Sequence, residues 1–236
     1  MVREKKAKGC VVSQGHQEFI ERKIGMNSAS IIVLPAGVDL RLFHTSKKLQ
    51  TLTLVYHGKL DKNRGVLALP MFLQKVNNSG IDAQLIVIGD GDCYEEIKKI
   101  SLEKENVTLH STLSQSDLSV ILSECHIGLL PMPNQKVWRL ASPLKRSEYA
   151  ASGLLILGIN HRGHSFENQE NLEWMKLLMR HEFHDGGINW IQSLDRKTML
   201  KLGMDARRFA EENLSWEHSV DVLEKNIHSC SNCITE

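Results

Sequence analysis

Short runs of Val, Ile and Leu recur along the chain, separated by segments whose apolar residues have helical spacing. Nearly continuous apolar runs of this length are typical of strands that are buried on both faces. The predicted strands cover residues 10–12, 31–34, 52–56, 85–88, 107–109, 127–130 and 154–157. The predicted helices between them cover residues 65–76, 94–103, 115–123 and 144–151. This alternation predicts an α/β fold, in which helices cover a parallel sheet.

The pattern becomes mainly helical after residue 158, with helices predicted at 171–179, 187–194, 198–212 and 217–228. Ser215 is expected to cap the start of the last of these helices. A polar stretch at residues 45–50 separates the first forty-odd residues from the alternating block. We therefore divide the chain into residues 1–48 and residues 49–236.

Composition indicates a globular protein: 42% of the 236 residues are hydrophobic and 24% are charged. Lys and Arg number 29 and Asp and Glu 28, so the formal net charge is only +1 and we expect no nucleic-acid partner. The five cysteines are odd in number and mostly isolated, which is typical of a reducing compartment. The basic start lacks the apolar stretch of a signal peptide, and no apolar run reaches the 18 residues that a membrane span needs. We expect a reducing, cytoplasmic location, with any membrane contact peripheral.

Ligands of open parallel sheets bind outside the carboxyl ends of the strands, so the residues after each apolar run are the first candidates for a site. Residues 58–65 follow one such strand and lead into a helix. Gly58 allows close approach of the backbone to a ligand, and Lys59 and Arg64 could neutralise a diphosphate through charge-assisted hydrogen bonds. The alternative is a solvated surface loop.

Two other segments after strands could also form a site. Gly89 and Gly91 begin a G-x-G-x-x-G pattern, but Tyr94 stands where the third glycine is required, so we interpret this segment as a simple turn. In residues 142–153, Pro143 suits the first turn of a short helix, and Glu148 lies beside residues that look buried. Glu148 is therefore a candidate to bind vicinal hydroxyls, the alternative being a solvated carboxylate on the helix surface.

No metal site is predicted. Structural zinc requires four ligands, usually imidazole or thiolate groups. Three pairs of such residues occur, but none has a second pair at a suitable spacing that would complete the four. The pairs are His161 with His164, His181 with His184, and Cys230 with Cys233.

Several segments, taken in order, resemble a known family. Residues 34–43 are similar to its "P-N-G-V-D…F" segment between domains, with Ala36 in place of asparagine, and residues 57–65 to "G-R-L-x-x-x-K-G", with the two cations exchanged. Residues 85–91 match "L-x-I-x-G-D-G", and residues 142–153 match "S-P-x-K-x-x-E-Y-x-A-x-G". Residues 107–113 and 206–216 also match family segments. The chain resembles the C-terminal, donor-binding half of a family-4 (group 1) retaining glycosyltransferase with the GT-B fold.

This resemblance implies a Rossmann-like domain that binds a nucleotide-diphosphate sugar and needs neither a metal nor another cofactor. It implies catalytic roles for Lys59 and Arg64 at the donor diphosphate and for Glu148 at the ribose hydroxyls. Further donor-binding positions implied by the resemblance are Gly58, Ser111, Thr112, Leu113, Ser142, Pro143, Leu144 and Lys145. Of these, residues 111–113 would border the base, and residues 142–144 would offer backbone amides to the phosphates. The expected partners are the nucleotide sugar and a carbohydrate or lipid-linked acceptor.

The chain also departs from the family. Many members carry a second glutamate seven residues before the Glu148 position, near the donor sugar. Here Leu140 stands eight residues before Glu148, and residues 134–141 must supply that contact differently. The N-terminal domain is largely absent, since only residues 10–13 and 17–23 resemble its last elements. We therefore expect a fragment, or a subunit whose other half is a separate polypeptide.

Two other functions remain open at this point. One is a non-catalytic module that binds a nucleotide sugar, and the other is a nucleotide-sugar epimerase, which lacks a segment like the one around Glu148.

Overall fold

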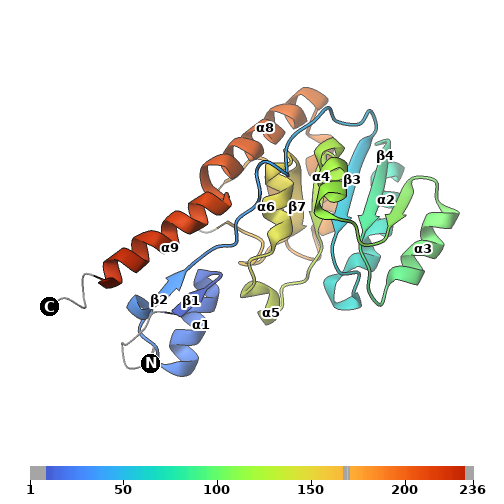
Figure 1. Ribbon diagram of the computed structural model, residues 1–236. Helices are drawn as coiled ribbons and strands as arrows, with labels where there is room; N and C mark the ends of the chain where they lie inside the picture. Colours follow the sequence, from blue (N-terminus) through green and yellow to red (C-terminus); the bar gives the residue numbers. More distant parts are fainter. Residues whose placement is uncertain (1–8, 167–168, 170, 232–236) are drawn as a thin grey trace.

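The computed structural model describes residues 9–166, 169 and 171–231, and its main part is a six-stranded, wholly parallel sheet (Figure 1). The order of the strands is β5-β4-β3-β6-β7-β8. Their bounds are β3 Leu52–His57, β4 Ala83–Ile88, β5 Val107–His110, β6 Ile127–Leu130, β7 Leu155–Ile159 and β8 Met175–Leu178. The order reverses direction between β3 and β6, where parallel α/β sheets open a crevice for ligands.

Helices cover both faces of the sheet, as predicted. On one face, Phe72 of α2 (Leu69–Asn78) and Gly187 of α7 (Phe183–Gln192) pack near Leu157 of β7. On the other face, Tyr149 of α6 (Leu144–Ala151) lies directly over Gly128 of β6, where any added Cβ would overlap its ring. This glycine lets α6 approach the sheet closely.

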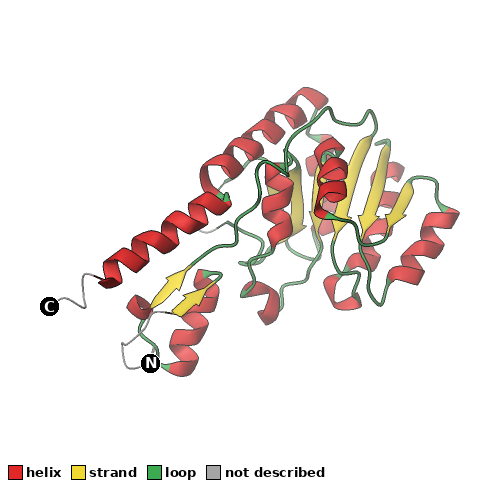
Figure 2. Ribbon diagram, viewed as in Figure 1, coloured by secondary structure: helices red, strands yellow, loops and turns green. Residues whose placement is uncertain are grey.

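The remaining helices complete the layers (Figure 2). They are η3 Lys62–Arg64, η4 Val66–Ala68, α3 Tyr94–Glu103, α4 Gln115–Glu124, α5 Lys136–Arg139, α8 Arg196–Asn213 and α9 Trp216–Ser231. Ser114, Asp195 and Ser215 each accept a hydrogen bond from an amide in the first turn of the helix that follows, which satisfies part of its unpaired backbone. The predicted cap at Ser215 is confirmed. No helix within the described ranges is both long and apolar enough to cross a bilayer.

The helix predicted at residues 171–179 is wrong. Met175–Leu178 forms strand β8, which pairs in parallel with β7, and Asn171 has a positive φ of 62° that no helix continues through. Leu172, Met175 and Leu178 do have helical spacing, but β7 offers an unpaired edge whose backbone groups need partners. Tertiary pairing therefore prevailed over the local pattern.

The N-terminal residues form a separate small unit. Strands β1 (Gly9–Val11) and β2 (Ile31–Val33) make a two-stranded parallel sheet, connected by α1 (Gln14–Ile24) and η2 (Ser28–Ser30), and this unit lies apart from the main sheet in Figure 2. Polar contacts connect it to the main domain beside the site described below. The Ser13 hydroxyl donates to the Leu140 carbonyl (2.9 Å), and Glu18 pairs with Arg162 at 2.7 Å.

Residues 34–51 run from this unit to β3. The polar residues where we place the boundary are fixed to the main domain: the half-buried Lys48 donates its ammonium hydrogens to the carbonyls of Ser123 and Ser152, both at 2.9 Å. Burial lowers the pKa of Lys48 to about 8.

Candidate functional site

Two adjoining cavities lie at the carboxyl ends of the strands, on either side of the end of β3. The central cavity, of about 370 Å³, has Arg64, Trp138, Lys145, Glu148 and His161 in its walls. The outer cavity, of about 300 Å³, lies toward β4 and β5 and is lined in part by Lys59, Asp90, Thr112 and Leu113. His57 and Gly58 border both cavities, so the two meet at this point.

The turns after β3 and β4 support each other at this junction. Gly58 and Gly89 have φ values of 116° and 143°, which favour glycine, and a Cβ on Gly89 would overlap the Gly58 carbonyl oxygen. The Leu60 amide donates to Asp90 (2.9 Å), and the Cys93 amide donates back to Leu60 (2.8 Å). The segment around Gly89 therefore acts as a turn that positions the loop after β3, in keeping with the interpretation from sequence.

Arg64 is held in a defined place in the central cavity. Its Nε lies 3.4 Å from an oxygen of Asp61, and its guanidinium lies 4.6 Å from the centre of the Trp138 ring. A guanidinium stacked on an indole loses less entropy when it binds an anion than a free one does. Trp138 belongs to α5, a short helix that was not predicted.

Lys145 is a buried cation beside Gly58. Its side chain is packed so closely that the residue is only 9% exposed, and its Nζ lies 5.2 Å from the centre of the Tyr56 ring. Burial and, to a smaller extent, the charge of Arg64 lower the pKa of Lys145 to about 8, while Glu148 opposes this shift. Within the described part of the chain no carboxylate lies within 4 Å of this ammonium, so a bound anion would stabilise its charged form.

Glu148 lies against a histidine that the sequence interpretation missed. Its Oε2 is 3.2 Å from Nε2 of His57, and the two residues are each 8% exposed. Burial lowers the pKa of His57, although Glu148 favours its charged form. The carboxylate oxygens of Glu148 can accept further hydrogen bonds beside this imidazole.

Helix α6 is positioned by buried contacts on both sides. Tyr149 packs over Gly128, and the buried Arg146 donates to the carbonyls of Gly163 (3.1 Å) and Ser165 and to the Ser142 hydroxyl (3.1 Å). No side chain caps the first turn of α6, whose residues Leu144 and Lys145 line the central cavity. The unpaired amides of a helix start favour anions.

The predicted site residues are divided between the two cavities. Arg64, Pro143, Leu144, Lys145 and Glu148 line the central cavity, Lys59, Thr112 and Leu113 line the outer cavity, and Gly58 borders both. Two predicted residues line neither: Ser111 is exposed, and Ser142 binds Arg146.

His57, Trp138 and His161 were missed by sequence reasoning. His57 and His161 do occupy the type of position that should have drawn attention, since each stands at or just after the carboxyl end of a strand. Trp138 gave no such signal.

The described residues contain no group of three or more metal-ligating side chains. His161 and His164 do meet, with ring centroids 3.7 Å apart, but both are buried and burial lowers both pKa values, that of His164 to about 3. The Cys230–Cys233 pair lies outside the residues whose side chains the structure describes.

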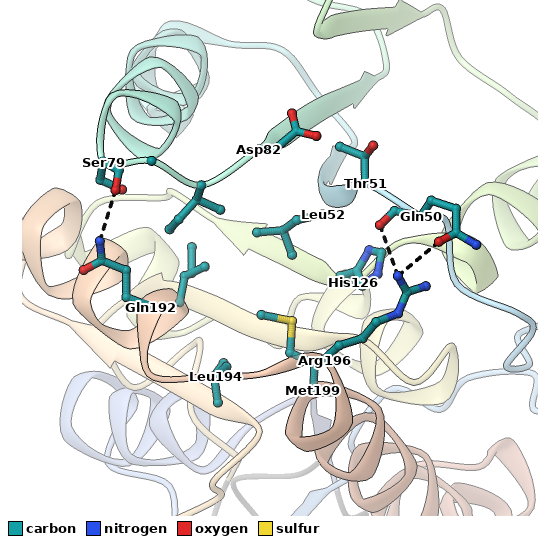
Figure 3. A pocket seen from close by; sticks show the side chains of 13 residues that line it. Gln50, Thr51, Leu52, Ser79, Asp82, His126, Gln192, Leu194, Arg196 and Met199 are labelled. Atoms are coloured by element: carbon teal, nitrogen blue, oxygen red, sulfur yellow. Dashed lines mark hydrogen bonds between the residues drawn. The ribbon is translucent and has the colours of Figure 1, made fainter.

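A larger cavity, of about 710 Å³, is at the opposite end of the sheet, and Figure 3 shows the side chains that line it. Its polar side chains hold the fold together: Arg196 donates to the Gln50 side chain (3.2 Å) and Gln192 to the Ser79 carbonyl (3.4 Å). His126 accepts a hydrogen bond from the Thr53 amide (3.1 Å). Since this cavity lies at the amino ends of the strands, the carboxyl-end cavities are the better candidates for a ligand site.

Known proteins share parts of the sequence and the fold of this chain. The family described as "Glycosyl transferases group 1" matches residues 51–179, which include Lys59, Arg64 and Glu148. No curated protein sequence is similar enough to count as a relative.

Solved structures share the fold at low sequence identity. Sucrose-phosphate synthase from Thermosynechococcus elongatus is 16% identical, with a TM-score of 0.75 over 96% of this chain and 58% of its own. A point mutant of TarM from S. aureus, in complex with fondaparinux, α-GlcNAc-glycerol and UDP, is 13% identical with a TM-score of 0.75 over 95% of this chain and 44% of its own. The pneumococcal O-GlcNAc transferase GtfA, in complex with UDP and GlcNAc, is 14% identical with a TM-score of 0.72 over 96% and 45%. The chain therefore spans about half the length of these proteins.

Proposed function

The chain belongs to the group 1 glycosyl transferases, and we propose that it is the donor-binding half of a retaining enzyme that transfers a sugar from a nucleotide-diphosphate sugar. One observation carries this proposal: Lys59, Arg64 and Lys145 surround the junction at Gly58, and Glu148 lies in the same walls. Three cations around one backbone turn suit a ligand with several negative oxygens.

The donor diphosphate binds at this junction. Arg64 and Lys145 approach it from the central cavity, Lys59 approaches it from the outer cavity, and the first turn of α6 adds backbone amides. Lys145 supports the assignment most directly, because its buried charge lacks a carboxylate partner in the described residues. The position of Gly58 next to it lets the phosphates approach the backbone.

The nucleoside occupies the space around the junction. The base lies in the outer cavity beside Thr112 and Leu113, and the ribose hydroxyls donate to Glu148, which His57 holds in place at 3.2 Å. Two structures with this fold, TarM and GtfA, contain UDP, which makes a nucleoside diphosphate the first ligand to test.

In the transfer step, the bond between the anomeric carbon of the sugar and the β-phosphate oxygen breaks, and its electron pair moves to that oxygen. The acceptor oxygen forms a new bond to the anomeric carbon on the same face, and its proton passes to the departing β-phosphate oxygen. Arg64, Lys59 and Lys145 stabilise the negative charge that develops on the diphosphate. Because these cations and the helix amides supply that stabilisation, the scheme requires no metal ion.

The sugar and the acceptor need residues beyond those named so far. Residues 134–141 contain no carboxylate that could contact the donor sugar. We assign this contact to Trp138 and His161 instead, because both line the central cavity. A carbohydrate or lipid-linked acceptor, and an N-terminal half supplied by another polypeptide, complete the proposed enzyme. A non-catalytic module that only binds the nucleotide sugar is the alternative.

Calorimetric titration with uridine, guanosine and adenosine diphosphates tests the donor site directly. We expect one of the three to bind, and we expect Arg64→Ala to weaken its binding at least tenfold, because a hydrogen bond to a charged group contributes about 1.5–3 kcal/mol. Arg41→Ala is the matched control, because Arg41 is exposed and distant from the cavities in sequence. Equal binding by both variants would contradict the proposal. Product formed from a sugar nucleotide distinguishes an enzyme from a binding module.

A further inference from the structure

A third cavity lies at the same end of the sheet, beyond the central cavity. This β8-side cavity, of about 350 Å³, is bordered by Pro131 after β6, Ile159 of β7 and Arg180 after β8. Gly65 lies so close to Pro131 that an added Cβ would be 2.8 Å from its carbonyl oxygen. These two residues form the wall toward the central cavity, which Arg64 and Met132 line on the other side. The three cavities thus follow the strand order from β5 to β8.

The walls of the β8-side cavity carry positive charge without compensation. Lys62 and Arg180 line it, together with His184 and the carboxamides of Asn63 and Gln135, and no Asp or Glu does. In the described ranges, neither Lys62 nor Arg180 has a carboxylate within 4 Å of its side-chain nitrogens. The acidic residues nearby have other positions: Asp61 pairs with Arg64, Asp92 accepts a hydrogen bond from the backbone amide of Lys62, and Glu182 and Asp185 line a different cavity. Such a site attracts anions and disfavours cations.

The start of helix α7 adds hydrogen-bond donors to these charges. Phe183 and His184 are the first two residues of this ten-residue helix, and both line the cavity. No side chain caps the helix, and in the described structure the amides of Phe183 and His184 make no backbone hydrogen bond. Unpaired amides at the positive end of a helix are suited to phosphate oxygens. Two cations and a helix start therefore converge on one space.

The floor of the cavity is apolar. Leu69, Pro131, Ile159 and Phe183 line it, and the ring of His184 stacks on Phe72 with centroids 5.8 Å apart. A ligand that fits must therefore combine a doubly charged group with an uncharged, partly apolar remainder. A phosphate monoester on a polyol or a lipid has this chemistry, whereas a bare inorganic anion uses only part of the site.

We propose that the β8-side cavity binds a phosphate monoester, at a site separate from the donor diphosphate. If the proposed function is correct, the molecule that carries this phosphate is the acceptor, because the nucleotide occupies the other two cavities of the row. The phosphate would then anchor the acceptor beside the bond that breaks. Lys62, Arg180 and the first amides of α7 hold the phosphate oxygens.

The test uses glycerol 3-phosphate as the probe and the imidazole resonances of His184 as the reporter. The whole chain is titrated with and without the nucleoside diphosphate that binds best. We expect the His184 signals to shift in both series, and the double variant Lys62→Ala with Arg180→Ala to weaken the affinity at least tenfold. The control double variant Lys99→Ala with Lys201→Ala removes two exposed cations from α3 and α8 and should change the affinity less than twofold.

The outcomes separate this proposal from the donor site. If the nucleotide binds but glycerol 3-phosphate does not shift His184, or shifts it equally in the Lys62/Arg180 double variant, the β8-side site is wrong and the proposed function stands. If no nucleotide binds but the phosphate does, the proposed function fails and the anion site stands.

A second experiment identifies the molecule that carries the phosphate. Binding of the chain to vesicles that contain phosphatidic acid is compared with binding to vesicles of phosphatidylcholine alone. Binding to phosphatidic acid that requires Lys62 and Arg180 indicates a lipid phosphate, whereas no such binding indicates a soluble phosphate ester.

Discussion

The carboxylate of Glu148 and the imidazole of His57 lie 3.2 Å apart in the wall of the central cavity, although one comes from α6 and the other from the last position of β3. Both are almost fully buried. His57 borders both cavities, and Glu148 lines the central one. The pair therefore fixes the orientation of the one acidic side chain that lines the central cavity.

Removal of Glu148 should abolish discrimination at the ribose. If Glu148 accepts hydrogen bonds from the ribose hydroxyls, the chain should bind a ribonucleoside diphosphate about tenfold more tightly than its 2′-deoxy form, since one charge-assisted hydrogen bond contributes about 1.5 kcal/mol or more. Calorimetry on Glu148→Ala should give nearly equal affinities for the two ligands. A variant that still discriminates as well as the unchanged chain would show that the ribose lies elsewhere.

Donor binding should weaken at alkaline pH, because Lys145 then loses its charge. Because its pKa is lowered to about 8, the free chain loses this cation as the pH rises through 8, while Arg64 stays charged. The affinity for the nucleoside diphosphate should therefore fall as the pH rises from about 7 to about 9.5, by at most about tenfold per pH unit above the pKa. Lys145→Met should bind more weakly at neutral pH and show a flat profile over the same range. A flat profile in the unchanged chain would refute this role.

Gly89 should tolerate no side chain. In Gly89→Ala, a φ of 143° strains the backbone and the new Cβ overlaps the Gly58 carbonyl, so we expect a loss of roughly 3 kcal/mol or more in the free energy of unfolding. Gly80→Ala is the matched control, because Gly80 also has a positive φ (88°) but nothing lies within 4 Å of an added Cβ. Urea unfolding should show a clearly smaller loss for the control. Similar losses would mean that strain alone, without the contact to Gly58, explains the effect.

Buried His164 should destabilise the fold in acid. Its Nδ1 donates to the Ile159 carbonyl (2.7 Å), and burial lowers its pKa to about 3, whereas the unfolded chain has a value near 6.5. Below about pH 6.5 the unfolded state therefore binds a proton that the native state does not, and stability falls as the pH decreases toward about 3. Between about pH 6 and about pH 5 this histidine alone should cost about 1 kcal/mol.

The measurement compares urea unfolding of the unchanged chain and of His164→Asn at these two pH values. The asparagine amide can still donate to the Ile159 carbonyl but does not titrate, so the loss between the two pH values should be smaller by about 1 kcal/mol. His181→Asn changes an exposed histidine and should leave the loss unaltered. An unchanged slope in His164→Asn would mean that the native ring already carries a proton at the lower pH.

The strands of the main sheet other than β8 could be predicted from local sequence because each is a short run rich in Val, Ile and Leu, and β6 and β7 are buried at every position. Helices α3 and α6 were predicted at their observed bounds, Tyr94–Glu103 and Leu144–Ala151, because apolar spacing and flanking turns agree there. β8 could not be predicted, because its residues also fit a helical period and only the free edge of β7 decides between the two.

The motifs around Lys59, Arg64 and Glu148 could be recognised from the chain alone, since each follows a strand or opens a helix and so keeps a local signature. Their grouping could not. Parallel strands bring loops that are far apart in sequence to one edge, and only the strand order decides which loops become neighbours. That order placed His57 against Glu148, Trp138 under Arg64, and Arg180 beside Lys62. The sequence by itself determined which residues can carry charge at the ends of strands, whereas the tertiary structure decided which of those charges share a cavity, because distance and burial arise only when the layers pack.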